Sequence, residues 1–360
     1  MRLLLCTVAL LASCSPVPVA PPPPTATPAH QAPPGPWPAA AHNAPRPGAE
    51  GRVAGAHEEL LVMLPSEGDR YGAIAERFLG SASLAWHVAQ ANPGLAAPVA
   101  GLPLRVPLLA PSPLGVTAAG AQAVTVLCYH RFGPGGEPGR SRMVMPIDRF
   151  EAQLNWLLRE GWTVLRLADF EAFLAGRRAL PPRSVLITVD DGWESFHRHA
   201  FPLLKRLQLP ATLFVTTDLV GTREGLTWAQ LRELAHSGLV EIQAHGRTHR
   251  DLTQPLAGET DAAWRRALRD ELRQPRLLLE RQLAGAGVRV RHLAYPYGAV
   301  NDAVLDALNA EPYTLAYTVR AGGNPFYAPP RQLRRTMIFG DHTLDDFIAR
   351  LQPLRALERP

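Results

Sequence analysis

Ser184-Val-Leu-Ile-Thr-Val-Asp190-Asp191-Gly192 is the most informative stretch of this chain. Its apolar, mostly β-branched run follows two prolines and is too short for a helix, so it predicts a short buried strand. The strand ends on two adjacent carboxylates, and Gly192 lets the chain turn at once. Because neighbouring side chains of an extended segment point in opposite directions, one carboxylate can bind a cation while the other handles a proton. An Asp-Asp-Gly turn can also end a strand without any chemistry, so this stretch alone leaves its function open.

Two histidines, His245 and His249, follow another short apolar run roughly fifty residues further on. Imidazoles four residues apart are a frequent way to hold a divalent metal, and a carboxylate can complete the ligand set. A histidine pair at this spacing can also be a coincidence within a loop. Together with the acidic pair, however, it favours a metal-dependent site.

Strands alternate with helices from about residue 124 onward, which predicts βα units around a parallel barrel. In such barrels the chemistry sits at the C-terminal ends of the strands, where Asp190, Asp191, His245 and Tyr297 all fall. The Arg-, Glu- and Leu-rich run 261–284 predicts a helix with a break at Pro275 and a solvated charged face. The predicted barrel strands are 124–129, 163–165, 184–189, 211–216 and 240–243.

The N-terminus has the form of a secretory signal, with an early arginine, a short apolar core and small residues at its end. Residues 11–14, Leu-Ala-Ser-Cys, resemble a bacterial lipoprotein processing site, so we interpret 1–14 as a signal peptide and lipobox with Cys14 as the lipidated residue. The alternative is an ordinary secretory signal with a chance cysteine. Residues 15–57 are rich in Pro and Ala, a composition that cannot bury a core and predicts an extended tether.

A compact stretch at 58–109 precedes a linker at 110–123 and the large domain at 124–360. Helices are predicted at about 69–79 and 83–91, and a short strand at 101–107. The order β-α-α-β with these residues resembles a LysM module, which binds N-acetylglucosamine-containing glycans. A small domain with the same fold and no ligand affinity is the alternative, because modules often keep a fold and lose its site.

Charge and cysteine content narrow the function further. The 360 residues carry a net charge of +5, almost wholly from arginine, with Lys205 as the only lysine. The arginines are scattered rather than clustered, so no nucleic-acid footprint is expected. Two of the three cysteines lie in the predicted signal, which leaves Cys128 alone in a strand, where a buried thiol behaves as a small hydrophobe.

From about Val124 to about Leu351 the chain resembles a polysaccharide deacetylase of the NodB-homology type, carbohydrate esterase family 4. Five signposts occur in the family's order: Tyr129-His130, Thr188-Val-Asp-Asp-Gly192, Pro210-Ala-Thr-Leu-Phe-Val215, His245 to His249, and Ala294-Tyr-Pro-Tyr-Gly298. The resemblance implies an α/β fold with a distorted (β/α) barrel, preceded here by the small LysM-like α+β module. It also implies hydrolysis of N-acetyl groups.

The resemblance assigns roles to individual residues. Asp191, His245 and His249 would hold one divalent metal ion, zinc by default, although cobalt or nickel would also suit these ligands. Asp190 would be the general base, and the backbone N–H near Tyr297 would help to hold the oxyanion. His130, after the first strand, would contact the substrate or form a structural hydrogen bond. His342 lies about where the family's last motif places a histidine, which makes it the candidate general acid.

Two positions depart from the common pattern. Many family members have an arginine where this chain has Ala294, and a serine or threonine where it has Gly246. Both departures resemble the branch that contains exported poly-N-acetylglucosamine deacetylases. Without that arginine, the partner that orients Asp190 must come from elsewhere in the chain.

These observations predict an exported, lipid-anchored deacetylase at the bacterial cell envelope, in the outer membrane or periplasm. Its partners would be an N-acetylglucosamine-containing glycan, such as a biofilm polysaccharide or peptidoglycan, and the membrane through Cys14. Two alternatives remain: a glycan-binding lipoprotein whose barrel is inactive, and an esterase that removes O-acetyl groups with the same chemistry.

Overall fold

The computed structural model describes residues 51–109, 111–117, 120–134 and 141–356. The predicted signal, the lipobox with Cys14 and the tether as far as residue 50 lie outside the described residues. Within the described part, no helix combines the length and apolar character needed to cross a bilayer.

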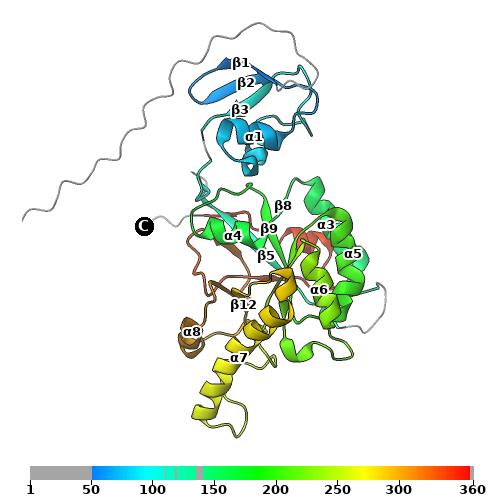
Figure 1. Cartoon of the computed structure of the whole chain (residues 1–360), viewed down its shortest axis with the longest axis vertical. Helices are drawn as coiled ribbons and strands as arrows, with labels where there is room; N and C mark the ends of the chain where they lie inside the picture. The colour runs from blue at the N-terminus through cyan, green and yellow to red at the C-terminus, as the bar shows by residue number, and fades with distance from the viewer. Residues whose placement is uncertain (1–50, 110, 118–119, 135–140, 357–360) are drawn as a thin grey trace, which may run out of the picture. The chain divides into compact units, whose positions relative to one another are not determined.

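A small three-stranded antiparallel sheet, with the order β1-β2-β3, opens the described chain (Figure 1). Its elements are β1 (Arg52–Ala56), β2 (Leu60–Leu64), α1 (Tyr71–Leu79), η1 (Ala82–Leu84), α2 (Ala85–Gln90) and β3 (Leu104–Pro107). The order is therefore β-β-α-α-β, and β1 falls inside the range predicted as tether. Apart from Arg52 its residues are small, and most of the strand is exposed, so it has no alternating apolar pattern. Its pairing with β2 holds it in the sheet. Leu61, Ile74, Val88 and Leu104 form the core of this unit.

The large domain is built on one mixed sheet that curls around an inner core. Its main strands follow the order β13-β12-β11-β10-β9-β5-β14. The strands from β5 to β13 along this path run parallel, whereas β14 is antiparallel to β5. Their bounds are β5 (Gly120–Tyr129), β9 (Ser184–Val189), β10 (Ala211–Val215), β11 (Val240–Ala244), β12 (His292–Ala294), β13 (Leu315–Tyr317) and β14 (Gly323–Pro325). The α/β prediction is confirmed, and the sheet is mixed rather than all parallel.

Shorter strands extend this sheet or pair beside it. β8 (Thr163–Val164) joins β9, and β4 (Val116–Thr117), β15 (Thr336–Met337) and β16 (Leu354–Arg355) all pair with β5. β6 (Arg131–Gly133) and β7 (Val144–Pro146) form a separate parallel pair. Through β15, the C-terminal part of the chain lies directly beside the strand that leads to His130.

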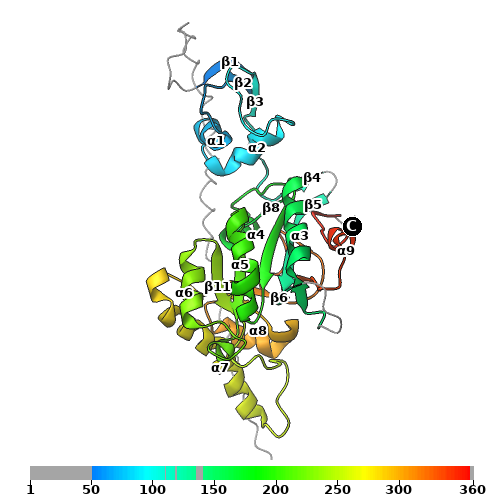
Figure 2. The same ribbon diagram turned by 90° about the vertical axis from the view of Figure 1, so that its right-hand side faces the viewer.

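Helices pack against the curled sheet, with α3, α5 and α6 along one face (Figure 2). The helical elements are α3 (Ile147–Arg159), α4 (Leu167–Leu174), η2 (Phe196–Ala200), α5 (Phe201–Leu207), η3 (Thr217–Leu219), α6 (Trp228–His236), α7 (Asp261–Gln282), η4 (Ala284–Ala286), η5 (Pro296–Gly298), α8 (Asp302–Asn309) and α9 (Leu344–Ile348). The alternation of strand and helix up to β13 agrees with the sequence-based interpretation.

The predicted break at Pro275 is wrong, because α7 runs without interruption from Asp261 to Gln282. A proline inside a helix removes one backbone hydrogen bond, here the one to the carbonyl of Glu271. The helix buries Pro275 itself together with the row Trp264, Leu268, Leu272 and Leu279, and this packing holds it together across the missing bond.

Strand β9 positions the acidic pair through the alternation of its side chains. Val185, Ile187 and Val189 pack in the larger hydrophobic cluster between sheet and helices, whereas Leu186 packs in the smaller inner cluster. Asp190 continues the inner row, and its N–H donates to the carbonyl of Tyr129 on β5. The carboxylate of Asp190 is thereby brought to the barrel mouth.

Candidate active site at the barrel mouth

Asp190 is buried in an ion pair with Arg335. The two side chains are 2% and 0% exposed, and Nη1 of Arg335 donates to Oδ1 of Asp190 at 2.6 Å. Burial alone would raise the pKa of Asp190, but the charge of Arg335 outweighs it and holds the pKa below its usual range. Asp190 is therefore kept ionised and able to accept a proton.

Asp191, His245 and His249 converge on one point. Oδ1 of Asp191 lies 3.2 Å from Nε2 of His249 and 3.4 Å from Nε2 of His245. Nδ1 of His245 lies 2.8 Å from the carbonyl of Ala294, which can only accept, so the neutral ring carries its proton there. Its Nε2 lone pair then faces the carboxylate. The other carboxylate oxygen, Oδ2, accepts from Nε1 of Trp193 at 2.7 Å.

This arrangement passes a test for a metal site. Oδ1 of Asp191 is buried, and no donor in the described part of the chain satisfies it with hydrogen-bond geometry. Buried polar atoms are rarely left in this state unless an ion or a water completes them. The donor set of one carboxylate and two imidazoles is the set that zinc and related divalent ions prefer. The three residues therefore fit a single divalent cation, and they are the three predicted from the sequence.

Backbone conformation brings these side chains together. Asp191, His249 and Tyr297 have positive φ angles of 75°, 64° and 59°. Such a conformation costs on the order of 1–3 kcal/mol for a residue with a side chain, and it is concentrated at functional sites. At Asp191 it breaks the strand alternation, so that its carboxylate turns to the same mouth as that of Asp190. The strand rule alone places the two carboxylates on opposite faces.

His130 and Cys128, at the end of β5, lie beside Asp190. Ligand-type atoms of Cys128, His130 and Asp190 are all within 4.8 Å of one another. The Sγ of Cys128 donates to Oδ2 of Asp190 at 3.5 Å, a contact that the sequence does not predict. Burial lowers the pKa of His130 although both aspartates oppose the effect, so its neutral form is favoured at the mouth.

Tyr297 and His342 occupy different settings. Tyr297 is 64% exposed, and its ring packs edge-on against His249, with 4.7 Å between the ring centroids. His342 is buried, and its Nδ1 accepts from the N–H of Phe339 at 3.2 Å within its own turn. Burial lowers the pKa of His342. Both roles assigned from the sequence stay predictions.

Arg335 is the functional residue that sequence reasoning missed. It stands just before β15, about 145 residues after Asp190 in the chain. Because β15 pairs in parallel with β5, the arginine is carried to the strand that neighbours β9. Arg335 is thus the partner of Asp190, a role that Ala294 cannot fill. The sequence around it, Arg334-Arg335-Thr336-Met337-Ile338, gives no local sign of this role.

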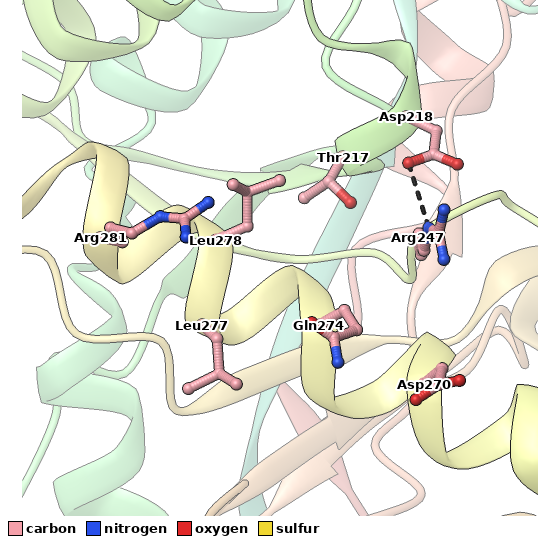
Figure 3. Close-up of a pocket in the computed structure, with 8 residues that line it drawn as sticks. All are labelled: Thr217, Asp218, Arg247, Asp270, Gln274, Leu277, Leu278 and Arg281. Atoms are coloured by element: carbon pink, nitrogen blue, oxygen red, sulfur yellow. Dashed lines mark hydrogen bonds and ion pairs between the residues drawn. The ribbon is translucent and has the colours of Figure 1, made fainter.

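A surface cleft of about 510 Å³ lies beside the metal-ligand loop, between η3 and α7 (Figure 3). Across it, Nε of Arg247 contacts Oδ1 of Asp218 at 3.4 Å. None of the residues that line this cleft is Asp191, His245 or His249, so the cleft lies next to the candidate metal site and is not part of it. It is lined by Thr217, Asp218, Arg247, Asp270, Gln274, Leu277, Leu278 and Arg281.

Comparison with known proteins agrees with this geometry. Residues 177–316 match a family model described as polysaccharide deacetylase. The match covers the middle of the large domain and is a resemblance to that family. The matched segment contains Asp190, Asp191, both histidines of the triad and Tyr297, whereas Arg335 and His342 lie beyond it.

The curated proteins that resemble the large domain are distant in sequence. The poly-beta-1,6-N-acetyl-D-glucosamine N-deacetylase of Staphylococcus aureus (strain MRSA252) is 26% identical over 192 residues, 51% of this chain. The chain covers 64% and 65% of the length of the first curated relatives that it matches.

Solved structures share the fold of the domain. The structure of IcaB from Ammonifex degensii has a TM-score of 0.56 and 28% identity, and the match covers 64% of this chain and 97% of that one. The deacetylase PplD of Streptococcus pyogenes, solved in complex with acetate, has a TM-score of 0.57 and 24% identity over 64% of this chain and 99% of that one.

Proposed function

We propose that this protein is a metal-dependent hydrolase that removes N-acetyl groups from an N-acetylglucosamine-containing polysaccharide. The observation that carries the proposal is that two carboxylates in different settings, Asp190 and Asp191, lie side by side at the same end of the sheet. Asp190 is ionised and held by Arg335, and Asp191 presents an unsatisfied oxygen to two imidazoles. The match to the polysaccharide deacetylase family model and the resemblance to poly-N-acetylglucosamine deacetylases support this substrate class.

The bound cation, which we take to be zinc with cobalt or nickel as alternatives, would polarise the amide carbonyl and make a water molecule more acidic. Asp191, His245 and His249 would hold it. Asp190 would accept the proton of the attacking water, because it is ionised and lies 3.6 Å from His245 (Oδ2 to Nε2) at the same mouth. Arg335 would keep that carboxylate in place and charged.

Three further residues would take part in the reaction. The backbone N–H near Tyr297, in the strained turn that begins after β12, would donate to the carbonyl oxygen as it gains charge. His342 would return a proton to the leaving amine as general acid. His130 would contact the sugar or its acetamido group at the mouth, next to Asp190.

The rest of the chain suggests where the enzyme works. We infer that Cys14 is lipidated, that residues 15–57 include a tether, and that the small three-stranded unit is a LysM-like glycan-binding module. The small core around Leu61, Ile74 and Val88 supports an independent module. A module that holds the polymer would raise the local concentration of acetylated units at the barrel. The site of action would be the bacterial cell envelope, at the outer membrane or in the periplasm.

Acetate release from N-acetylglucosamine oligomers by the full-length protein tests the proposal. We expect release that stops with a chelator and returns when zinc, cobalt or nickel is added. Asp190→Asn should lose activity by about 10²–10⁴-fold, because the proton acceptor is removed. It should still bind metal when folded, because the three metal-binding side chains are unchanged. His249→Ala should lose activity together with metal affinity.

Two other outcomes would point elsewhere. Release from O-acetylated but not N-acetylated sugars would identify an esterase. A folded, metal-loaded protein that binds the glycan and releases no acetate from either substrate would be a binding lipoprotein with an inactive barrel. In each case the deacetylase proposal would be wrong.

A further inference from the structure

The two histidine ligands are separated by a loop of three residues, Gly246, Arg247 and Thr248. One carboxylate from another part of the chain holds this loop. Oε2 of Glu271 accepts from the N–H of Arg247 at 2.7 Å and from the N–H of Thr248 at 3.0 Å. Oε1 accepts from the hydroxyl of Thr248 at 2.6 Å. Glu271 therefore satisfies three donors between the two ligands.

Glu271 is buried, with 3% of its surface exposed, although it belongs to a helix whose charges the sequence suggested were solvated. Hydrogen bonds to an ionised carboxylate are about twice as strong as neutral ones. Burying the carboxylate without them would be unfavourable, so the residue and the loop depend on each other.

The opposite side of the same loop is bound to the segment that follows β10. The carbonyl of His245 accepts from Oγ1 of Thr216 at 3.3 Å, and the carbonyl of Gly246 accepts from the N–H of Thr217 at 3.3 Å. The carbonyl of Arg247 accepts from the N–H of Asp218 at 2.9 Å. The loop is thus held on both sides: its carbonyls accept hydrogen bonds from the segment after β10, and its N–H groups donate to Glu271.

The approach of Glu271 also leaves little room for a side chain at Gly246. Gly246 has a φ of 77°, and a Cβ built there would lie 3.2 Å from Oε2 of Glu271 and 3.3 Å from Cγ of Pro296. A side chain would push against the carboxylate while straining the backbone. The loop then delivers His249 in its own positive-φ conformation, with Nε2 3.2 Å from Asp191.

We propose that Glu271 is a positioning residue that sets metal affinity by holding the loop between His245 and His249 in its ligating conformation. This inference rests on the proposed function only in that the triad binds a metal. Residues outside the ligand set that orient the ligands typically change metal affinity by about 10–100-fold when they are replaced. Glu271 meets this description through the loop backbone.

The test is the zinc dissociation constant of the full-length protein, measured by competition with a chromogenic chelator well below the unfolding temperature of the metal-free protein. Glu271→Ala should bind zinc about 10–100-fold more weakly. Glu271→Gln should remain close to wild type, because its amide oxygen can still accept both N–H groups and its NH₂ can donate to Oγ1 of Thr248. Asp270→Asn, an exposed neighbour on α7, is the matched control and should bind like wild type.

Gly246→Ala tests the same contact without removing the carboxylate, which covers the case that Glu271→Ala does not fold. It should also weaken zinc binding. Wild-type affinity in both Glu271→Ala and Gly246→Ala would overturn the inference, as would equal weakening by Asp270→Asn. Failure of the wild-type protein itself to bind zinc, cobalt or nickel would instead overturn the proposed function together with this inference.

Discussion

Polar side chains at the N-terminal and C-terminal ends of the sheet strands differ in their hydrogen bonding. At the N-terminal ends, the hydroxyl of Ser184 donates to the carbonyl of Pro181 at 2.6 Å, and Oε1 of Glu241 accepts from the N–H of Leu167 at 2.9 Å. At the C-terminal ends, Asp191 keeps an unsatisfied oxygen, and Asp190 depends on a buried arginine. One end uses polar groups to complete backbone hydrogen bonds, and the other keeps them available.

The difference shows where binding and catalysis can take place. An ordinary hydrogen-bonded group is satisfied in the folded state and has nothing left to offer a ligand. The mouth instead brings together carboxylates with lowered pKa values and three residues with positive φ angles, a combination typical of active sites. The N-terminal ends are expected to contribute to stability alone. Four predictions test this division, starting with the largest expected effect.

Replacing Arg335 by Met should have the largest effect, because it leaves the carboxylate of Asp190 buried and unpaired. Removing one partner of a buried ion pair typically costs about 3–5 kcal/mol of unfolding free energy. Urea unfolding of the metal-free protein measures this cost, and acetate release should fall as well because the base is no longer held. The double variant Asp190→Asn with Arg335→Met should recover part of the stability. A single variant as stable as wild type would contradict the assignment.

Trp193→Phe should weaken metal binding without unfolding the protein. The change removes the N–H that orients Oδ2 of Asp191, a partner of a ligand rather than a ligand. We expect zinc affinity to fall by about 10-fold, at the lower end of the range for such partners. Trp228→Phe, at the start of α6, is the matched control and should leave the zinc affinity unchanged. Equal losses in the two variants would mean that the effect is general destabilisation.

Glu241→Ala should lower stability and leave the chemistry intact. It removes the acceptor of the first N–H of α4 and leaves a buried donor unsatisfied, at a cost of about 1–3 kcal/mol in urea unfolding. The kcat/KM of the folded protein should equal that of wild type. Asp306→Ala, an exposed carboxylate on α8, serves as control and should change stability by less than about 0.5 kcal/mol. A drop in kcat/KM for Glu241→Ala would break the division between the two ends.

His292, at the start of β12, should make the fold sensitive to acid to a smaller extent. Burial, with a contribution from Arg291, lowers its pKa to about 3, although Glu171 lies 3.8 Å away. In the unfolded chain an imidazole titrates at about 6.5. Between these two pH values only the unfolded state takes up the proton. The contribution of neutral His292 to the free energy of unfolding is therefore complete above about pH 6.5 and is lost as the pH falls toward 3.

His292→Gln should therefore lose less unfolding free energy than wild type between pH 7 and pH 4.5, as measured by urea unfolding at both values. His236→Gln, which replaces an exposed histidine of α6, controls for the general effect of losing an imidazole. If His292→Gln and wild type lost the same stability, protonation of this residue would not limit the folded state.

The sequence alone determined the α/β class, most strands and helices of the large domain, and which acidic residues and histidines meet at the site. These features follow from local patterns: an apolar run that ends in Asp190 and Asp191, a second run that ends in His245, and a fixed spacing to His249. The spacing between ligands survives folding because it is a property of one short segment. The strand β1 was not predicted because its mostly exposed residues carry no such pattern.

Only the tertiary structure decided which residues support the site. Arg335 meets Asp190 because β15 pairs with β5, and Glu271 meets the ligand loop because α7 packs over β11. Neither contact has a local signal, since each joins residues far apart in the chain through the pairing or packing of whole elements. The backbone angles that turn Asp191 and His249 inward are likewise stabilised by the assembled fold, because the residues themselves disfavour them.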